Sequence, residues 1–338
     1  MTSRISDSIK ILRFPLVALV VFIHIPRVPD ANECYRIVTS FFSCRISGVA
    51  VPMFFAMSGY LFFASGFNGT IYKEKLKHRV RSLLLPYILW NLVAFVLLVT
   101  PNVRSYEFTF RNILVSFWDC HNSFINASSH SPIDFPLWYV RDLMVCVILS
   151  PIVYYVVKQL RIIAPAALVI CWLSGLECNI PGISVISLTF FSLGAYMALY
   201  ETNAIDDNKG LWSTCCLCLF LLLSLLFAVI EPIAGLTYWD KGTALLGVIC
   251  IPSFVCTLLE RYPDIGYVSN KLSSMSFFLY ASHAIIIKYI YWTFLKLDFA
   301  NGLMVYFLTY FVTITFCCLA YGLINKTCPR FLLILNGR

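Results

Sequence analysis

Two ionisable residues on the first apolar segment have side chains that can take part in catalysis. Arg13 and His24 lie eleven residues apart, and at about 100° per residue this spacing places both on one face of a helix, about 16 Å apart along its axis. A buried neutral imidazole can take a proton from a hydroxyl and return it to a leaving group. We therefore interpret His24 as a general base, with Arg13 at the other end of one polar stripe.

Each of these residues also has a purely structural explanation. An ionisable side chain near the centre of a bilayer costs about 2.5–3.5 kcal/mol on insertion scales, so it needs a partner, a cavity or a function. Arg13 could extend to the lipid headgroups, and His24 could bind a backbone carbonyl. The sequence leaves both explanations open.

Polar residues on other apolar segments could support this chemistry. Arg141 and Asp142 are neighbours on a predicted helix and point about 100° apart, so we expect them to have different partners. Asp142 could orient His24 through its ring N–H or pair with another helix. His283 could act as His24 does or form an interhelical hydrogen bond. The supporting residues that the sequence predicts are Asp142, Arg141, Tyr280, His283 and Ser58.

A dense basic run precedes the third apolar segment. Its cationic residues are Lys73, Lys75, Lys77, Arg79 and Arg81. Such a run next to a span normally marks the cytoplasmic side and attracts anionic lipid. The alternative is a phosphate clamp for a cytosolic nucleotide-like donor, since guanidinium and ammonium groups suit phosphate.

The composition is that of an integral membrane protein. Of 338 residues, 60% are hydrophobic and only 12% are charged, and the mean hydropathy is +0.81. These values exclude a water-soluble globule, a disordered chain and a nucleic-acid-binding protein. The net charge of +8 is explained more simply by loop residues that set orientation than by an anionic partner.

Ten apolar runs have about the 17 to 25 residues that a spanning helix needs. They cover residues 9–27, 45–65, 80–100, 136–157, 162–177, 182–200, 211–231, 241–259, 272–294 and 302–324. The sequence therefore predicts an all-α polytopic bundle of about ten transmembrane helices. We expect one membrane domain over residues 1–338, without an appended soluble domain.

The distribution of Lys and Arg predicts the orientation. Most of the 25 basic residues fall in segments that are cytoplasmic if the N-terminus is inside, which predicts an N-in/C-in topology. The longest connection, residues 101–135, then faces outward, contains His121 and His130, and is expected to form a lid or vestibule.

The fourteen cysteines do not form a metal-ligand pattern. Several lie within apolar runs, where cysteine behaves as a small hydrophobic residue, and no paired CxxC motif is present. Cys34 and Cys44 could pair in one outer loop, but the sequence does not decide this.

Several segments, taken in order, resemble the membrane acyltransferase-3 family, the ten-helix O-acyltransferases of surface polysaccharides and related glycans. The matching pieces are Arg13 with His24 (R-x10-H), Phe54-Phe55-Ala56-Met57-Ser58-Gly59-Tyr60-Leu61, Arg79/Arg81 with Pro86-Tyr87, Leu137-Trp138-Tyr139, and Ser276-Phe277-Phe278-Leu279-Tyr280 with His283. No single piece is specific, but their order, spacing and expected topology together identify the chain as a member.

The resemblance implies an O-acyltransferase of the bacterial inner (plasma) membrane. Its donor would be cytosolic acyl-CoA, most often acetyl-CoA, as a co-substrate rather than a bound cofactor. Its acceptor would be a hydroxyl of a cell-surface glycan or a lipid-linked sugar precursor. Arg13 and the basic residues at 73–81 would hold the donor phosphates. His24 would be the general base, with a transient acyl-histidine as the less favoured variant, and Tyr280, Ser58 or Arg141 could stabilise the oxyanion.

Other classes of function remain open at this stage. Ten spans would also suit a transporter or flippase. Such a protein is expected to have paired broken helices in corresponding halves of the chain, and the sequence shows no such symmetry. A membrane glycan polymerase would show acidic pairs and a large outer loop, for which Glu107, Asp119 and Asp134 are modest support. A purely structural scaffold would need neither His24 nor Arg13.

Overall fold

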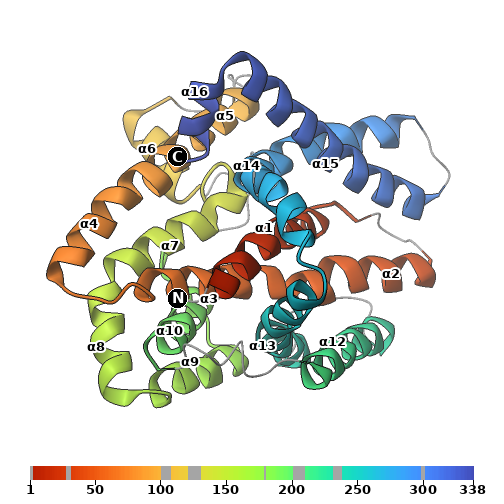
Figure 1. Cartoon of the computed structure of the whole chain (residues 1–338). Coiled ribbons are helices and arrows are strands. Elements are labelled where there is room, and N and C mark those ends of the chain that lie inside the picture. The colour runs from red at the N-terminus through yellow and green to blue at the C-terminus, as the bar shows by residue number, and fades with distance from the viewer. Residues whose placement is uncertain are drawn as a thin grey trace.

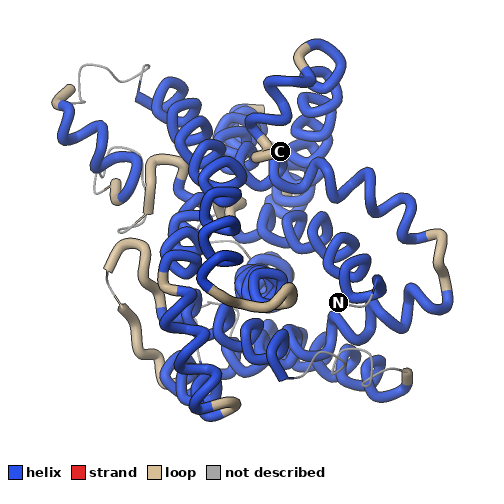
Figure 2. The backbone as a smooth tube through the Cα atoms, turned by 60° about the vertical axis from the view of Figure 1, so that its left-hand side comes forward, coloured by secondary structure: helices blue, strands red, loops and turns tan. Residues whose placement is uncertain are grey.

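The computed structural model describes residues 3–27, 32–99, 108–120, 131–178, 180–200, 210–230, 238–297 and 301–338. Within these ranges every regular segment is a helix, apart from one isolated β-bridge between Ile180 and Ile183 (Figure 1; Figure 2). The predicted all-α class is therefore confirmed. Much of the connection 101–135, including Glu107, His121 and His130, lies outside the described residues.

The helices follow one another with short connections. The longer ones are α1 (Ser3–Ile23), α3 (Ala50–Phe63), α5 (Leu85–Val99), α7 (Trp138–Ile148), α8 (Ser150–Leu160), α9 (Ile163–Leu173), α10 (Val185–Tyr200), α12 (Leu211–Ile230), α13 (Tyr238–Arg261), α14 (Ile265–Lys296) and α15 (Gly302–Thr327). The remaining helical elements are α2 (Glu33–Ser40), α4 (Gly69–Arg79), α6 (Phe110–Trp118), α16 (Pro329–Leu335) and the 3₁₀ turn η6 (Phe135–Leu137).

Among the described residues, five helical segments are long and apolar enough to cross a membrane. They are Glu33–Phe63, Gly69–Val99, Leu211–Ile230, Trp239–Arg261 and Gly302–Thr327. The pair α7 and α8 bends by 66° at its junction and forms either a sixth, broken span or a re-entrant loop. This helix content supports an integral membrane protein, while the total of ten spans and the direction of insertion stay predictions.

Asparagine and threonine side chains set where several helices begin. The Asn68 side chain accepts a hydrogen bond from the Ile71 N–H at 2.8 Å, at the start of α4. The Asn301 side chain accepts a hydrogen bond from the Leu303 N–H at the start of α15. The Thr109 side chain accepts one from the Asn112 N–H at the start of α6. Such caps satisfy N–H groups that have no partner within the helix.

Helix α1 lies at the centre of the molecule. It packs against α3, α13, α14 and α15, and Figure 1 shows it surrounded by later segments of the chain. Leu12, Leu16 and Val20 on this helix are buried. This helix therefore presents much of its surface to other helices.

Two glycines allow α3 and α10 to pack closely. A Cβ atom on Gly59 would lie 2.2 Å from the Phe191 carbonyl oxygen, and one on Gly194 would lie 2.0 Å from the Ala56 carbonyl oxygen. Small residues that let two backbones approach are the usual device of membrane helix pairs. Gly59 and Gly194 thus hold α3 and α10 in close contact.

Two π-helical segments widen the turns of the long spans. η1 (Phe41–Ile46) connects α2 to the 3₁₀ segment η2 (Ser47–Val49), which leads into α3, and η3 (Val80–Leu84) connects α4 to α5. Within η1, the Ser43 hydroxyl donates to the Phe22 carbonyl at 2.7 Å and lies 2.6 Å from the Tyr306 hydroxyl. Single π-turns of this kind occur frequently at functional sites.

Gly194→Ala should destabilise the protein by roughly 3 kcal/mol, because the added methyl group forces α3 and α10 apart. The control is Gly322→Ala on α15, where a Cβ atom would meet nothing within 4 Å. That change should be neutral or slightly stabilising. Thermal unfolding of the two purified variants in detergent checks this, and equal unfolding temperatures would contradict the α3–α10 contact.

Candidate active site

A single stripe of α1 contributes to two separate cavities. Ile9, Arg13 and Val17 line one of them, and Val20 and His24 line the other. These residues recur at spacings of three and four, which is one face of an α-helix. Arg13 lies within α1, whereas His24 lies in the turn directly after its last residue, Ile23, so the shared helix face stays a prediction.

The first cavity, which we call the arginine cavity, has a volume of about 310 Å³. Guanidinium groups from three distant segments line it: Arg13 of α1, Arg79 of α4 and Arg338 after α16. Arg79 and Arg338 lie close enough to Arg13 for their charges to interact. No Asp or Glu side chain is among the lining residues, so the three guanidinium groups give the cavity an excess of positive charge that suits an anionic ligand.

The other members of the basic run do not line this cavity. Lys73, Lys77 and Arg81 are exposed on α4 and η3. The Lys75 ammonium donates to the Phe62 carbonyl and, at 3.3 Å, to the Gly66 carbonyl. Lys75 therefore caps the C-terminal end of α3. Successive residues of a helix point in different directions, and of these five cations only Arg79 lines the arginine cavity.

The second cavity, the histidine cavity, has a volume of about 320 Å³ and contains His24, Arg27 and Asp240. It meets the arginine cavity at Phe54, Tyr139 and Tyr280, which line both. We call these three side chains the partition. The Tyr139 hydroxyl lies 3.0 Å from the Ser58 hydroxyl, and the Tyr280 hydroxyl donates to the Pro136 carbonyl.

A third cavity, the lateral cavity, of about 300 Å³ lies on another side of His24. His24 lines both this cavity and the histidine cavity. Its ring meets Phe135 edge-on, with 4.6 Å between the ring centroids. The imidazole is therefore reachable from two internal spaces, as a catalytic base requires.

His283 lies beside His24, with 5.2 Å between their ring centroids. Its Nδ1 lies 2.6 Å from the Tyr280 carbonyl. Because a carbonyl can only accept, Nδ1 must carry the proton and Nε2 is left as an acceptor. That Nε2 is buried and has no hydrogen-bond partner among the described residues.

Arg141 and Asp142 do not have the separate partners that their spacing suggested. The Arg141 Nε and Nη2 atoms donate to one Asp142 carboxylate oxygen at 3.1 and 3.0 Å, and Nη1 donates to the Trp118 carbonyl at 2.7 Å. The prediction of different partners was wrong, since a long guanidinium side chain can fold back onto its neighbour. Neither residue lines the three cavities, so the alternative in which Asp142 orients His24 loses its support.

Several residues of these cavities were not singled out from the sequence. Arg338 lies far along the chain from Arg79 and carries no local signal. Asp240 lines the histidine cavity and forms a buried ion pair with Arg45. Cys34 and Cys44 are both free thiols.

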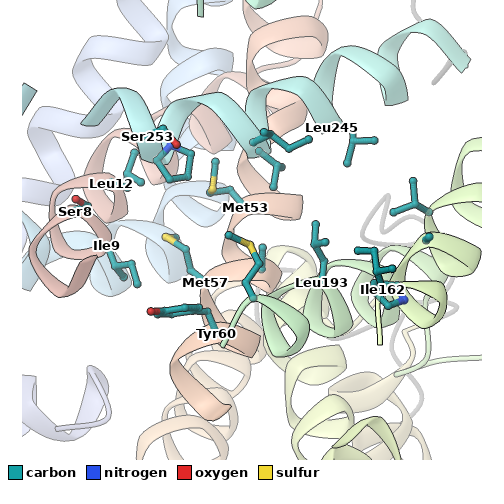
Figure 3. A pocket seen from close by; sticks show the side chains of 18 of the residues that line it. Ser8, Ile9, Leu12, Met53, Met57, Tyr60, Ile162, Leu193, Leu245 and Ser253 are labelled. Atoms are coloured by element: carbon teal, nitrogen blue, oxygen red, sulfur yellow. The ribbon is translucent and has the colours of Figure 1, made fainter. Parts of the chain in front are cut away.

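An apolar cavity of about 460 Å³ adjoins the arginine cavity, and Ile9 and Met57 line both. Figure 3 shows its wall of α1 and α3 side chains, including Leu12 and Met53, opposite Leu193 and Leu245. Its lining offers almost only hydrocarbon, so it can hold an apolar group but provides no groups for acyl transfer.

Asp240→Ala should destabilise the protein by about 3–5 kcal/mol, because it leaves the Arg45 guanidinium buried without its carboxylate. Asp7→Ala is the matched control. It breaks an ion pair with Lys10 whose side chains are 43% and 48% exposed, and such a pair contributes about 0–1 kcal/mol. Unfolding free energies in detergent measure both changes, and a loss at Asp240 no larger than at Asp7 would contradict the buried pair.

The chain resembles known proteins in sequence. The chain is similar to the succinoglycan biosynthesis protein ExoH of Rhizobium meliloti (strain 1021), with 24% identity over 363 aligned positions that cover all of this chain and 93% of that protein. No solved structure matches the chain.

The family comparison covers most of the chain. A family described as an acyltransferase domain matches residues 6–322, which include the arginines at 13 and 79, the partition, His24 and His283. The resemblance noted in the sequence is thereby confirmed, and the chain belongs to the acyltransferase-3 family.

Proposed function

We propose that the protein is a membrane O-acyltransferase that moves an acyl group, in the simplest case acetyl, from cytosolic acyl-CoA to a hydroxyl of a cell-surface glycan or its lipid-linked precursor. Membership of an acyltransferase family supports transfer of an acyl group. Similarity to a protein of succinoglycan biosynthesis supports a polysaccharide acceptor. A multi-pass location in a bacterial inner membrane, with ten spans and both termini inside, completes the proposal.

The observation that carries this proposal is the partition. A cavity with three guanidinium groups and a cavity with His24 have Phe54, Tyr139 and Tyr280 in common in their linings. An anionic donor held by Arg13, Arg79 and Arg338 would have its phosphates at one side of this layer. Its thioester would reach His24 by passing between the two tyrosines.

The transfer step needs only the donor, the acceptor and His24. The acceptor oxygen attacks the thioester carbonyl carbon, and its proton passes to the unprotonated ring nitrogen of His24. The carbon–sulfur bond then breaks, and the coenzyme A thiolate leaves and takes the proton back from His24. General-base assistance of this kind contributes about 10²–10⁴ in rate.

Two neighbours complete the mechanism. His283, held by the Tyr280 carbonyl, presents an unpartnered Nε2 beside His24 and is placed to accept its ring N–H, which would fix the tautomer that acts as base. The hydroxyls of Ser58 and Tyr139 line the arginine cavity at the partition. The Ser58 hydroxyl is the better oxyanion donor, because the donor groups of Arg141, Tyr280 and Tyr139 already have carboxylate or carbonyl partners.

His24→Ala should lower the transfer of labelled acetyl from acetyl-CoA into glycan by about 10²–10⁴-fold, because the hydroxyl loses its base. Membrane abundance should not change. His78→Ala, which removes an exposed imidazole, is the control and should transfer normally. Full activity in the His24 variant would remove this residue from the mechanism.

Arg79→Gln should raise the KM for acyl-CoA by about 10- to 100-fold, the effect of losing a hydrogen bond to a charged group. Arg81→Gln removes the same charge two residues away, from an exposed position outside the cavity. It should leave KM within about twofold of the unchanged protein, since surface charge contributes little. Initial rates of coenzyme A release at several acyl-CoA concentrations distinguish these outcomes, and equal KM values would contradict the assignment of the arginine cavity to the donor.

A further inference from the structure

The lateral cavity contains a carboxyl group that the mechanism above does not use. Asp134 lines this cavity together with His24, and it is only 2% exposed. Neither of its carboxylate oxygens has a hydrogen-bond partner among the described residues. A buried carboxyl without hydrogen bonds is costly, so its retention indicates a ligand that brings donors.

The backbone around Asp134 holds this carboxyl in place. The Asp134 N–H donates to the Asn91 side-chain oxygen at 3.2 Å, and the Asn91 amide nitrogen donates to the Tyr87 carbonyl at 2.8 Å. The Leu137 N–H donates to the Asp134 carbonyl at 2.9 Å, at the start of η6. Asp134 is thus anchored to α5 on one side and to the start of α7 on the other.

The rest of the lateral cavity is aromatic and apolar. Its aromatic side chains are Phe135, Tyr291 and Trp292, and Lys288 is the cationic residue of its lining. Trp292 is 56% exposed and lies on the last turns of α14, so it can form the mouth of the cavity. A volume of about 300 Å³ is at the lower end of the range for small-molecule sites.

These features together fit a pyranose ring. A sugar has hydroxyl donors around its edge, which a carboxylate can accept in pairs, and apolar C–H faces, which pack on an aromatic ring. A hydrocarbon chain would leave Asp134 without partners. A divalent cation would need several oxygen ligands, and Asp134 is the sole carboxylate in the lining.

We propose that the lateral cavity binds the acceptor sugar, with the Asp134 carboxyl accepting hydrogen bonds from ring hydroxyls and Trp292 packing on the ring face. This rests on the proposed function for the identity of the reaction. The sugar would present a further hydroxyl to His24, which lines both the lateral and the histidine cavities. Donor and acceptor would then approach one imidazole from two separate spaces.

The test uses the full chain in lipid nanodiscs with methyl β-D-glucopyranoside as the sugar probe and labelled acetyl-CoA as the donor. Saturation-transfer NMR measures sugar binding, and label transfer gives the KM for sugar and for donor separately. Asp134→Asn should weaken sugar binding and raise the sugar KM about 30-fold, with the donor KM unchanged, because a hydrogen bond to a charged group is lost. Trp292→Ala should weaken sugar binding and raise the sugar KM about tenfold, because the sugar loses its aromatic contact. Trp292 is 56% exposed.

Asp264→Asn, at an exposed position at the start of α14, is the matched control and should bind the probe normally. Binding by both cavity variants as in the unchanged protein, or no sugar binding by the unchanged protein, overturns the proposal. A loss in Asp134→Asn that raises both KM values, with Trp292→Ala unaffected, also overturns it, because the role of Asp134 would then be structural. Sugar binding that depends on Asp134 without any label transfer supports the sugar site and instead rejects the acyltransferase mechanism.

Discussion

Removing charged side chains from water is unfavourable, and this constraint explains where the ionisable residues of the bundle lie. Arg45 and Asp240 pair with each other, and so do Arg141 and Asp142. The buried Lys241 ammonium donates to the Trp172 carbonyl at 2.9 Å. Such groups are tolerated because each has a partner. Arg13, Arg79 and Arg338 differ, because they line a cavity that contains no Asp or Glu side chain.

The cavities form a series from the arginine cavity to the lateral cavity. The partition of Phe54, Tyr139 and Tyr280 separates the first from the second, and His24 is shared by the second and third. In the proposed reaction, excluding water from these cavities would protect the thioester from hydrolysis and strengthen electrostatic interactions with the reacting groups.

Local pattern was a reliable guide wherever one helix decides the geometry. The eleven-residue spacing predicted that Arg13 and His24 follow one another along the first helix, and the structure places Arg13 within α1 and His24 in the turn after it. The sequence pattern did not predict the direction in which a long charged side chain points. Arg141 folds back onto Asp142, and of the five cations at 73–81 only Arg79 faces the cavity. The π-turns of η1 and η3, which change helix register near these residues, have no sequence signature that would have revealed them.

The sequence by itself determined that this chain is an all-helical membrane protein of the acyltransferase-3 family with His24 on a polar face, because hydropathy, helical period and ordered motifs are properties of neighbouring residues. Only the tertiary structure decided which groups share a space. Arg338 joins Arg13, Asp240 neutralises Arg45, and the unpartnered carboxyl of Asp134 lies in a cavity with His24. These associations join residues up to 325 positions apart, and they depend on how whole helices pack, which no local pattern encodes.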